Sequence, residues 1–336
     1  MARLTPLGTE PAGSPGPGGL KVAGQNGSAG LTIEEVSKSF GDLTAVNGVS
    51  LHVEPGTVYG LIGPNGAGKT TTMRMVMTIL VPDRGQIRWN GRPVAEVASR
   101  KFGYLPEERG LYPNMTIRDQ LRFFAALHGM AGPAVDREID RWIERLALGE
   151  HAAKKVEELS KGNAQKVQFI AALLHHPELL ILDEPFSGLD PVNVHILKNT
   201  LLDLARNGTA ILLSTHRMEH VEELCERMAL IKGGSIVAEG TVTDVRRSTG
   251  RLRLRLAAEP GERAAELLAS FDELPPARPT PFGWEVQLPA AFRAQAVLER
   301  ALAEGLSITR FEVSPPSLEE TYVMLMGGEV NGANNE

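Results

Sequence analysis

Two stretches of the sequence combine residue types that suit phosphate and metal chemistry. The first is GPNGAGKT at residues 63–70, which matches the spacing G-x-x-x-x-G-K-[ST]. Its glycines allow the backbone to curl around an anion without Cβ clashes, and the amides that begin the next helix face that anion. Lys69 would neutralise the β- and γ-phosphates of a nucleotide, Thr70 would offer a hydroxyl to Mg²⁺, and Thr71 would reach the α-phosphate. The predicted nucleotide-binding residues are Gly63, Pro64, Asn65, Gly66, Ala67, Gly68, Lys69, Thr70 and Thr71.

The second stretch, LLILDE at residues 179–184, ends in two adjacent carboxylates. Its four apolar residues predict a buried strand, and open α/β sheets bind ligands at the carboxyl ends of such strands. Asp183 suits Mg²⁺, which prefers oxygen ligands. Glu184 is placed to orient or deprotonate a water molecule that attacks a phosphate. The alternative, two carboxylates that only cap the next turn, is disfavoured by the phosphate-binding pattern upstream.

The elements around residues 63–70 fit a strand, a loop and a helix. VYGLI at residues 58–62 predicts the strand, and a helical period follows Gly68 until Pro82 and Gly85 close it. This context disfavours a plain glycine-rich turn with a surface lysine. The apolar face of the predicted helix consists of Met73, Val76, Met77 and Leu80. Hairpin turns are predicted at Asn47-Gly48 and Asn90-Gly91.

Strands and helices alternate in the chain as far as about residue 244. AILLST at residues 210–215 is a second continuous apolar strand, as expected in a parallel sheet covered on both faces. Helical patterns occupy residues 116–148, 167–174 and 194–204. We predict an α/β fold with a parallel sheet.

The composition changes after about residue 245. Strand and helix patterns there follow the order βαββαβ of a ferredoxin-like unit. In RLRLRL at residues 251–256, the alternation predicts a half-exposed strand whose three arginines form a solvated face rather than a binding stripe. A last helix is predicted after Ser317, a plausible N-cap.

Composition excludes several classes of protein. Acidic residues outnumber basic ones by 41 to 35 among 336 residues, which gives a net charge of −6 and argues against nucleic-acid binding. A single cysteine, Cys225, excludes an internal disulfide framework and fits a reducing cytosol. The apolar runs are too short for a membrane-spanning helix, so we expect any service to a membrane to depend on a partner.

Further motifs give the chain a family resemblance. LSKGN (Leu159, Ser160, Lys161, Gly162 and Asn163) resembles the LSGGQ signature of ATP-binding cassette (ABC) ATPases, and it lies about 20 residues before LLILDE. SGLD, ending at Asp190, resembles the D-loop of that family, and His216 matches its switch histidine. Phe40 in SKSFG takes the place of the aromatic residue that stacks on adenine. The C-terminal part, which ends PPSLEETY, is similar to the small domain appended to cassettes of drug- and sodium-export type.

The resemblance implies a P-loop NTPase cassette with a mainly parallel sheet core, an antiparallel β subdomain and a helical subdomain, followed by a small ferredoxin-like α+β domain. It implies ATP and Mg²⁺ as cofactors and a head-to-tail homodimer in which the signature residues of one copy cover the phosphates held by the other. Glu184 and His216 would be catalytic, and Thr70 and Asp183 would bind the metal. Taken without the resemblance, Phe40 is more often a core residue and His216 a satisfied polar one.

Two positions depart from the family pattern. Glu107 stands where the family has the Q-loop glutamine that contacts the metal. Its carboxylate is able to bind Mg²⁺ in place of the glutamine, but it adds negative charge near the γ-phosphate. Lys161 stands where the signature often has glycine, and it would either help to bind an anion or remain solvated.

The function expected from these motifs is ATP hydrolysis that drives a separate integral-membrane permease, and analogy with the appended domain favours export over import. The alternatives are a soluble ABC ATPase of translation or DNA repair, and a P-loop kinase or GTPase. We expect a disordered tail at 1–30, a nucleotide-binding domain at 31–244, an accessory domain at 245–328 and a tail at 329–336. We further expect a cytoplasmic protein held on the inner face of the membrane by its permease, with residues 107–112 as the contact.

Overall fold

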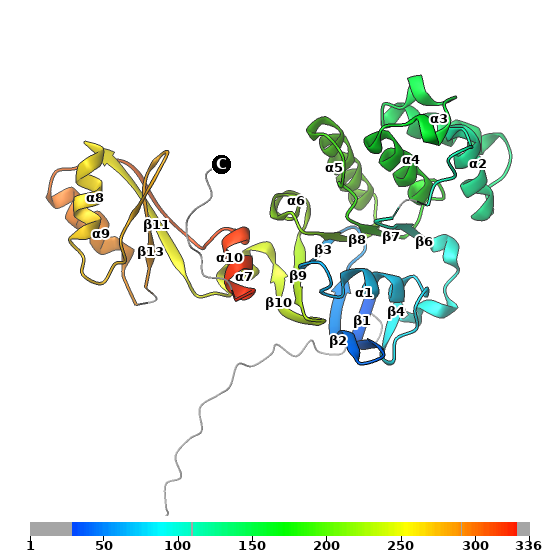
Figure 1. Ribbon diagram of the computed structural model, residues 1–336. Coiled ribbons are helices and arrows are strands. Elements are labelled where there is room, and N and C mark those ends of the chain that lie inside the picture. Colours follow the sequence, from blue (N-terminus) through cyan, green and yellow to red (C-terminus); the bar gives the residue numbers. More distant parts are fainter. Residues whose placement is uncertain (1–28, 109, 290, 328–336) are drawn as a thin grey trace, which may run out of the picture.

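The computed structural model describes residues 29–108, 110–289 and 291–327, which form three β-sheets with their helices (Figure 1). The predicted tails lie outside the described residues, except for residues 29 and 30. The first sheet is antiparallel, with the order β2-β1-β4-β5. Its strands are β1 (Leu31–Phe40), β2 (Leu43–Val53), β4 (Arg84–Trp89) and β5 (Arg92–Pro93).

The second sheet, called the large sheet below, has the order β10-β9-β3-β8-β7-β6. Neighbouring strands in this sheet run parallel to each other, except that β10 pairs antiparallel with β9. Every residue of β7 and β8 is buried, so the prediction of parallel strands covered on both faces is confirmed. The strands are β3 (Val58–Ile62), β6 (Phe102–Leu105), β7 (Leu179–Asp183), β8 (Ala210–Thr215), β9 (Arg227–Lys232) and β10 (Ser235–Thr241).

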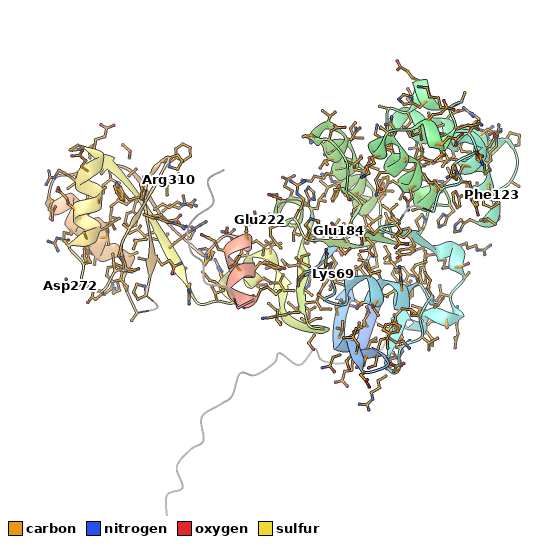
Figure 2. All side chains as sticks on the ribbon, viewed as in Figure 1. Lys69, Phe123, Glu184, Glu222, Asp272 and Arg310 are labelled. Atoms are coloured by element: carbon orange, nitrogen blue, oxygen red, sulfur yellow. The ribbon has the colours of Figure 1, made fainter. Side chains whose placement is uncertain are left out.

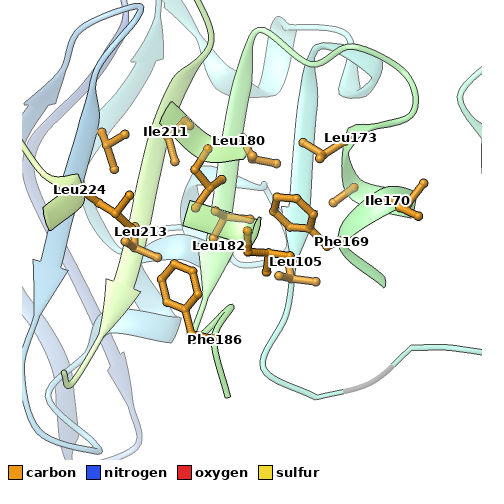
Figure 3. Close-up of a cluster of buried hydrophobic side chains, with 14 of the residues drawn as sticks. Leu105, Phe169, Ile170, Leu173, Leu180, Leu182, Phe186, Ile211, Leu213 and Leu224 are labelled. Atoms are coloured by element: carbon orange, nitrogen blue, oxygen red, sulfur yellow. The ribbon is translucent and has the colours of Figure 1, made fainter. Parts of the chain in front are cut away.

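Alternate residues of the large sheet enter two different cores. On β7, Leu180 and Leu182 pack with the helices α2 to α6, whereas Leu179 and Ile181 pack with α1 and the antiparallel sheet. Figure 3 shows Leu180 and Leu182 near Phe169 of α4. The large sheet is therefore the middle layer of the cassette. Because a core packs against each of its faces, the positions of its strand ends are fixed. These helices are α1 (Lys69–Val76), α2 (Ile117–Leu127), α3 (Pro133–Arg145), α4 (Lys161–Leu173), α5 (Pro191–Arg206) and α6 (Met218–Leu224). No helix among the described residues is long and apolar enough to cross a bilayer.

The third sheet, called the small sheet below, lies beyond α7 (Val242–Arg247) and has the order β12-β13-β11-β14. All its pairs are antiparallel, and α8 and α9 pack on one face around a separate core. The predicted βαββαβ order is confirmed. Its elements are β11 (Leu252–Glu259), α8 (Gly261–Ala269), β12 (Arg278–Thr280), β13 (Gly283–Leu288), α9 (Ala294–Ala303) and β14 (Ser307–Ser314). The chain continues into α10 (Leu318–Leu325), whose N-cap is Ser317, as predicted.

One of the two predicted hairpin turns is wrong. Asn90 and Gly91 do form the turn between β4 and β5, with positive φ at both residues. Asn47 and Gly48 instead lie inside β2, where the register with β1 shifts and Gly48 has a φ of 64°. A residue with positive φ serves a β-bulge as well as a hairpin turn, so the dipeptide alone does not distinguish them.

Two predicted helices differ in extent. The helix after Gly68 ends at Val76, because Thr78 adopts a φ of 57°, so Leu80 lies beyond it. The pattern over residues 116–148 is interrupted between α2 and α3, where Gly129 and Gly132 both have positive φ. Hydrophobic periodicity persisted across this break because both helices face one core.

The prediction of a solvated face of arginines is confirmed for Arg251, which is exposed just before β11, but it is wrong for Arg253 and Arg255. Arg253 is only 9% exposed and forms an ion pair with Glu320 at 2.7 Å. Arg255 pairs with Glu285 at the same distance. Charge alternation in a strand does not reveal carboxylates that arrive from later elements.

Candidate active site

The glycine-rich loop between β3 and α1 is shaped by close approaches of the backbone. A Cβ added to Gly63 would lie 2.3 Å from the carbonyl oxygen of Ile231, and one added to Gly68 would lie 2.4 Å from that of Ala45. Gly68, with a φ of 106°, is the N-cap of α1, and the amides of the first turn of a helix have no partner within it. The loop therefore provides a cradle with free donors for an anion.

Lys69 is the first residue of α1, and its ammonium group curls back over this loop. Its Nζ donates to the carbonyl oxygens of Gly63 at 2.7 Å and Pro64 at 3.0 Å. Burial lowers the pKa of Lys69, and the carboxylates of Glu184 and Asp183 partly oppose that shift. Carbonyl oxygens do not neutralise the charge of the ammonium group, so this charge stays available to a phosphate.

A hydroxyl and a carboxylate meet at the carboxyl end of β7. Thr70 Oγ1 donates to Asp183 Oδ2 at 2.7 Å, and the hydroxyl of Ser214 on β8 donates to Asp183 Oδ1. Asp183 is 1% exposed. Hard oxygen donors gathered beside the anion cradle are the ligands that Mg²⁺ prefers, so the residues present fit that ion.

Glu184 follows Asp183 and pairs with His216, which follows β8. Nδ1 of His216 lies 2.8 Å from Oε1 of Glu184. Glu184 adopts a φ of 50°, an unfavourable backbone conformation that is found at functional sites in many proteins. Burial raises the pKa of Glu184, whereas the hydrogen bond from His216 and the charge of Lys69 lower it. Figure 2 labels Lys69 and Glu184 near the middle of the larger part of the molecule.

The signature residues lie at the start of α4. Ser160 is the N-cap, and its Oγ accepts from the amide of Asn163 at 3.2 Å. Ser160 and Lys161 are exposed, and Leu159, Gly162 and Asn163 are partly exposed. Asp190 is the N-cap of α5 and accepts from the amides of Val192 and Asn193. These side chains are accessible to a second molecule.

Phe40 and Glu107 are both exposed. Phe40 ends β1, is 48% exposed and has the ammonium of Lys38 5.8 Å above its ring. Glu107 lies after β6, and the negative charge of its carboxylate raises the pKa of Lys69, against the larger effect of burial. The structure thus brings together Lys69, Thr70, Asp183, Glu184 and His216, with Glu107 close enough to influence Lys69.

Comparisons with known proteins agree with this geometry. A family model described as ABC transporter matches residues 46–187, and one described as ATP-binding protein DrrA1-3-like, C-terminal domain, matches residues 240–326. The chain is 45% identical over 297 residues to the uncharacterized ABC transporter ATP-binding protein YhaQ of Bacillus subtilis, which covers 88% of this chain and 98% of the relative.

The chain belongs to the ATP-binding proteins of ABC transporters.

Two further similarities extend the comparison. The Nod factor export ATP-binding protein I of Paraburkholderia xenovorans is 35% identical over 311 residues, covering 90% of this chain and 98% of the relative. A solved structure of the ATP binding subunit of an ABC transporter is 33% identical with a TM-score of 0.62, covering 66% of this chain and 94% of that one. The predicted cassette fold is confirmed, and this cassette is an ATPase subunit. The roles of the individual residues stay predictions.

Sequence reasoning missed three polar residues that hold the loops of the cassette in place. Ser214 bonds Asp183, Gln165 Nε2 donates to the carbonyl oxygen of Pro185 at 3.2 Å, and Gln168 Nε2 donates to those of Pro106 and Glu108 at 3.2 and 3.1 Å. Both glutamines are buried on α4. The available signal was a polar residue repeated at a helical spacing among apolar ones, in KGNAQKVQFIAAL.

Proposed function

We propose that this cassette binds ATP with Mg²⁺, hydrolyses it between two copies of the chain, and thereby drives export through a separate integral-membrane permease. The observation that carries the proposal is the meeting of three groups at one edge of the large sheet: the Lys69 cradle, the Thr70–Asp183 pair at 2.7 Å and the Glu184–His216 pair at 2.8 Å. We also propose that the nucleotide-binding domain ends at residue 244 and that the accessory domain begins at residue 245.

Hydrolysis would follow from the placement of Glu184. Its carboxylate is the general base that takes a proton from the attacking water, and a pKa raised by burial makes it a better base. His216 holds the carboxylate through its Nδ1 contact and presents its exposed ring to the γ-phosphate. Thr70 and Asp183 would hold Mg²⁺, which supplies charge neutralisation on the phosphate oxygens. Lys69 supplies a further positive charge on the same side.

Dimerisation would complete the site. Ser160, Lys161 and Gly162 lie at the N-terminus of α4, where free amides and the helix dipole favour an anion. Their exposure suits contact with the phosphates held by a second copy, and the exposed Asp190 suits the same interface. Phe40, half exposed at the end of β1, would stack on adenine.

The permease contact would include a cluster of aromatic side chains beyond Glu107. Tyr112 lies 5.4 Å from Phe123 and 6.5 Å from Phe124 between ring centroids. Tyr112 is 50% exposed and Leu127, on the same helix as the phenylalanines, is 65% exposed. Exposed apolar groups that are contiguous mark interaction sites, and a helix from the membrane protein would cover this surface. Glu107 immediately precedes this segment, which links the contact to the nucleotide.

Export rather than import is supported by the relative that is named for Nod factor export and by the resemblance of the C-terminal part to the domain appended to cassettes of export type. Attachment to a permease would place the protein on the cytoplasmic side of the membrane.

The Glu184→Gln variant tests the catalytic assignment. A glutamine keeps the size of the side chain but cannot accept the proton, so kcat should fall by about 100-fold or more while ATP still binds. The same variant should accumulate as an ATP-bound dimer in gel filtration, whereas Lys69→Ala should not. Hydrolysis by Glu184→Gln at the wild-type rate would exclude Glu184 as the base.

The partner is tested by purifying the tagged chain from solubilised membranes. Recovery of a multi-span membrane protein is expected, and its recovery should fall when Phe123 and Leu127 are both replaced by Ser. Exposed Phe282 and Leu302, replaced together by Ser, form the control, because they remove the same two side-chain types from the part of the chain that contains the small sheet. Recovery of ribosomes instead of a membrane protein would contradict the proposal.

A further inference from the structure

Helix α10 follows the small sheet in sequence but packs on the cassette. Leu318 is fully buried in the same core as Val221 and Leu224 of α6, and Tyr322 packs against that core. Figure 1 shows α10, in red, beside α7 and apart from α8 and α9. The ammonium of Lys232 on β9 donates to the carbonyl oxygen of Met326 at 2.9 Å. The last helix is therefore part of the larger core.

The helix α6, on which α10 packs, adjoins both catalytic residues of the proposed mechanism. It begins at Met218, two residues after His216. The ring of His220 on α6 packs against Phe186, at 4.5 Å between centroids, and Phe186 lies two residues after Glu184. A displacement of α6 would therefore act on both ends of the His216–Glu184 contact.

Helix α6 has only seven residues, so its position depends on its neighbours rather than on its own stability. Lys198 of α5 pairs with Glu223 at 2.7 Å on one side. On the other side, the amide of Leu318 donates to Glu222 Oε1 at 3.4 Å, and Figure 2 places Glu222 next to α10. Helix α6 is therefore in contact with α5 through Glu223 and with α10 through Glu222.

The small sheet grips the first turn of α10 through Glu320. This carboxylate accepts from Arg253 of β11 at 2.7 Å and from Arg278 of β12 at 3.0 Å. It also accepts from the amide of its own N-cap, Ser317, at 2.7 Å. Arg253 is 9% exposed and also lies 3.6 Å from Glu285 of β13, so its guanidinium links the small sheet to α10. A rotation of the small sheet would consequently pull on α10.

We propose that α10 is a brace that positions α6, and through it the His216–Glu184 pair, and that the small sheet controls the seating of this brace through Arg253 and Glu320. This inference rests on the proposed function of Glu184 in hydrolysis. Leu318, Glu222 and Arg253 are positioning residues, because none of them touches the reacting groups. A partner that moves the small sheet would change the rate of hydrolysis without contacting the nucleotide.

The brace is tested by Leu318→Ala, with Leu267→Ala as the matched control. Leu267 is a buried leucine of α8 in the core of the small sheet, so both variants lose the same atoms from a core. Leu318→Ala should lower kcat by about tenfold and leave the KM for ATP within about twofold, because misplacement of a catalytic pair affects the chemical step. Leu267→Ala should change neither value. Equal changes in kcat, or a change confined to KM, would overturn the proposal.

Cys225 provides a readout without nucleotide. It is the only cysteine in the sequence, is buried, and is the C-cap of α6. The rate at which a thiol reagent labels native Cys225 should rise several-fold in Leu318→Ala and not in Leu267→Ala, since labelling requires the region around α6 to open. Unchanged labelling in Leu318→Ala would refute the brace even if the chain showed no ATPase activity, so this failure is distinguishable from failure of the proposed function. If Leu318→Ala does not fold, Tyr322→Ala should give the same changes with smaller size.

The grip of the small sheet is tested by Arg253→Met against Arg310→Met. Arg310 lies on β14 of the same sheet and pairs with Glu312, and Figure 2 labels it apart from α10. Arg253→Met should accelerate Cys225 labelling and lower kcat, whereas Arg310→Met should do neither. Identical behaviour of the two variants would show that the small sheet does not control the brace.

Discussion

Acid should weaken the fold through a half-buried histidine outside the active site. His175 follows α4, and its ring stacks on that of His128 with 3.6 Å between centroids and 3° between planes. Its Nε2 lies 3.0 Å from the carbonyl oxygen of Phe102. Burial, assisted by the neighbouring His128, lowers the pKa of His175 from 6.5 to about 4. The folded protein therefore keeps His175 neutral where the unfolded chain would bind a proton.

The sign and size of the effect follow from this difference. Because the folded pKa lies below the unfolded one, the unfolded state binds more protons between the two values. The contribution of His175 to stability is complete above about pH 6.5 and is lost as the pH falls towards about 4. Between about pH 8 and about pH 5, the free energy of unfolding should fall by ~2 kcal/mol through this group alone.

Urea unfolding followed by tryptophan fluorescence at these two pH values measures the loss of stability. Trp142 is a suitable reporter because it lies in the same core as Leu174, the residue before His175. The variant His175→Gln keeps a donor for the carbonyl of Phe102 but does not titrate, so its loss between the two pH values should be smaller by ~2 kcal/mol. His195, exposed on α5, is the control, and His195→Gln should behave as the wild type. If His175→Gln loses as much stability as the wild type, the reasoning is refuted.

Three further predictions concern the nucleotide cradle. Lys69→Ala should weaken ATP binding by ~2 to 3 kcal/mol in equilibrium dialysis, since a charge-assisted contact is lost, and unchanged affinity would mean that the ammonium does not meet the phosphates. Phe40→Ala should weaken ATP binding by ~1 to 3 kcal/mol and leave tripolyphosphate binding unaltered, as expected of a group that touches only the base. Gly63→Ala should lower the free energy of unfolding by ~1 to 3 kcal/mol because its Cβ would meet the Ile231 carbonyl at 2.3 Å, whereas Gly149→Ala, with open space around it, should not.

The chemistry-bearing motifs were the part of the site that the sequence could predict. The spacing of residues 63–70, the carboxylates after LLILD and His216 after AILLST each sit next to a buried strand, and parallel strands bring their carboxyl ends to one edge. Strand topology alone therefore accounts for the meeting of Lys69, Asp183 and His216. The family resemblance, rather than periodicity, supplied their expected roles.

What the sequence could not predict depends on contacts between distant elements. The bulge at Gly48 and a hairpin turn need the same backbone conformation, so only the pairing of β1 with β2 decides between them. Arg253 pairs with Glu320, 67 residues later, and nothing local to β11 announces that partner. Gln165 and Gln168 look like ordinary helix residues until the loops whose carbonyls they bind are in place.

The position of α10 also has a consequence for biosynthesis. Residues around Val221 and Leu224 emerge from the ribosome well before Leu318, which completes their core. While the small sheet is being translated, the apolar surface of the nascent nucleotide-binding domain that Leu318 will cover stays accessible to chaperones and proteases. A premature stop codon after residue 317 would leave that apolar surface permanently exposed. The truncated protein should therefore be degraded in the cell and not accumulate as a stable, shortened cassette.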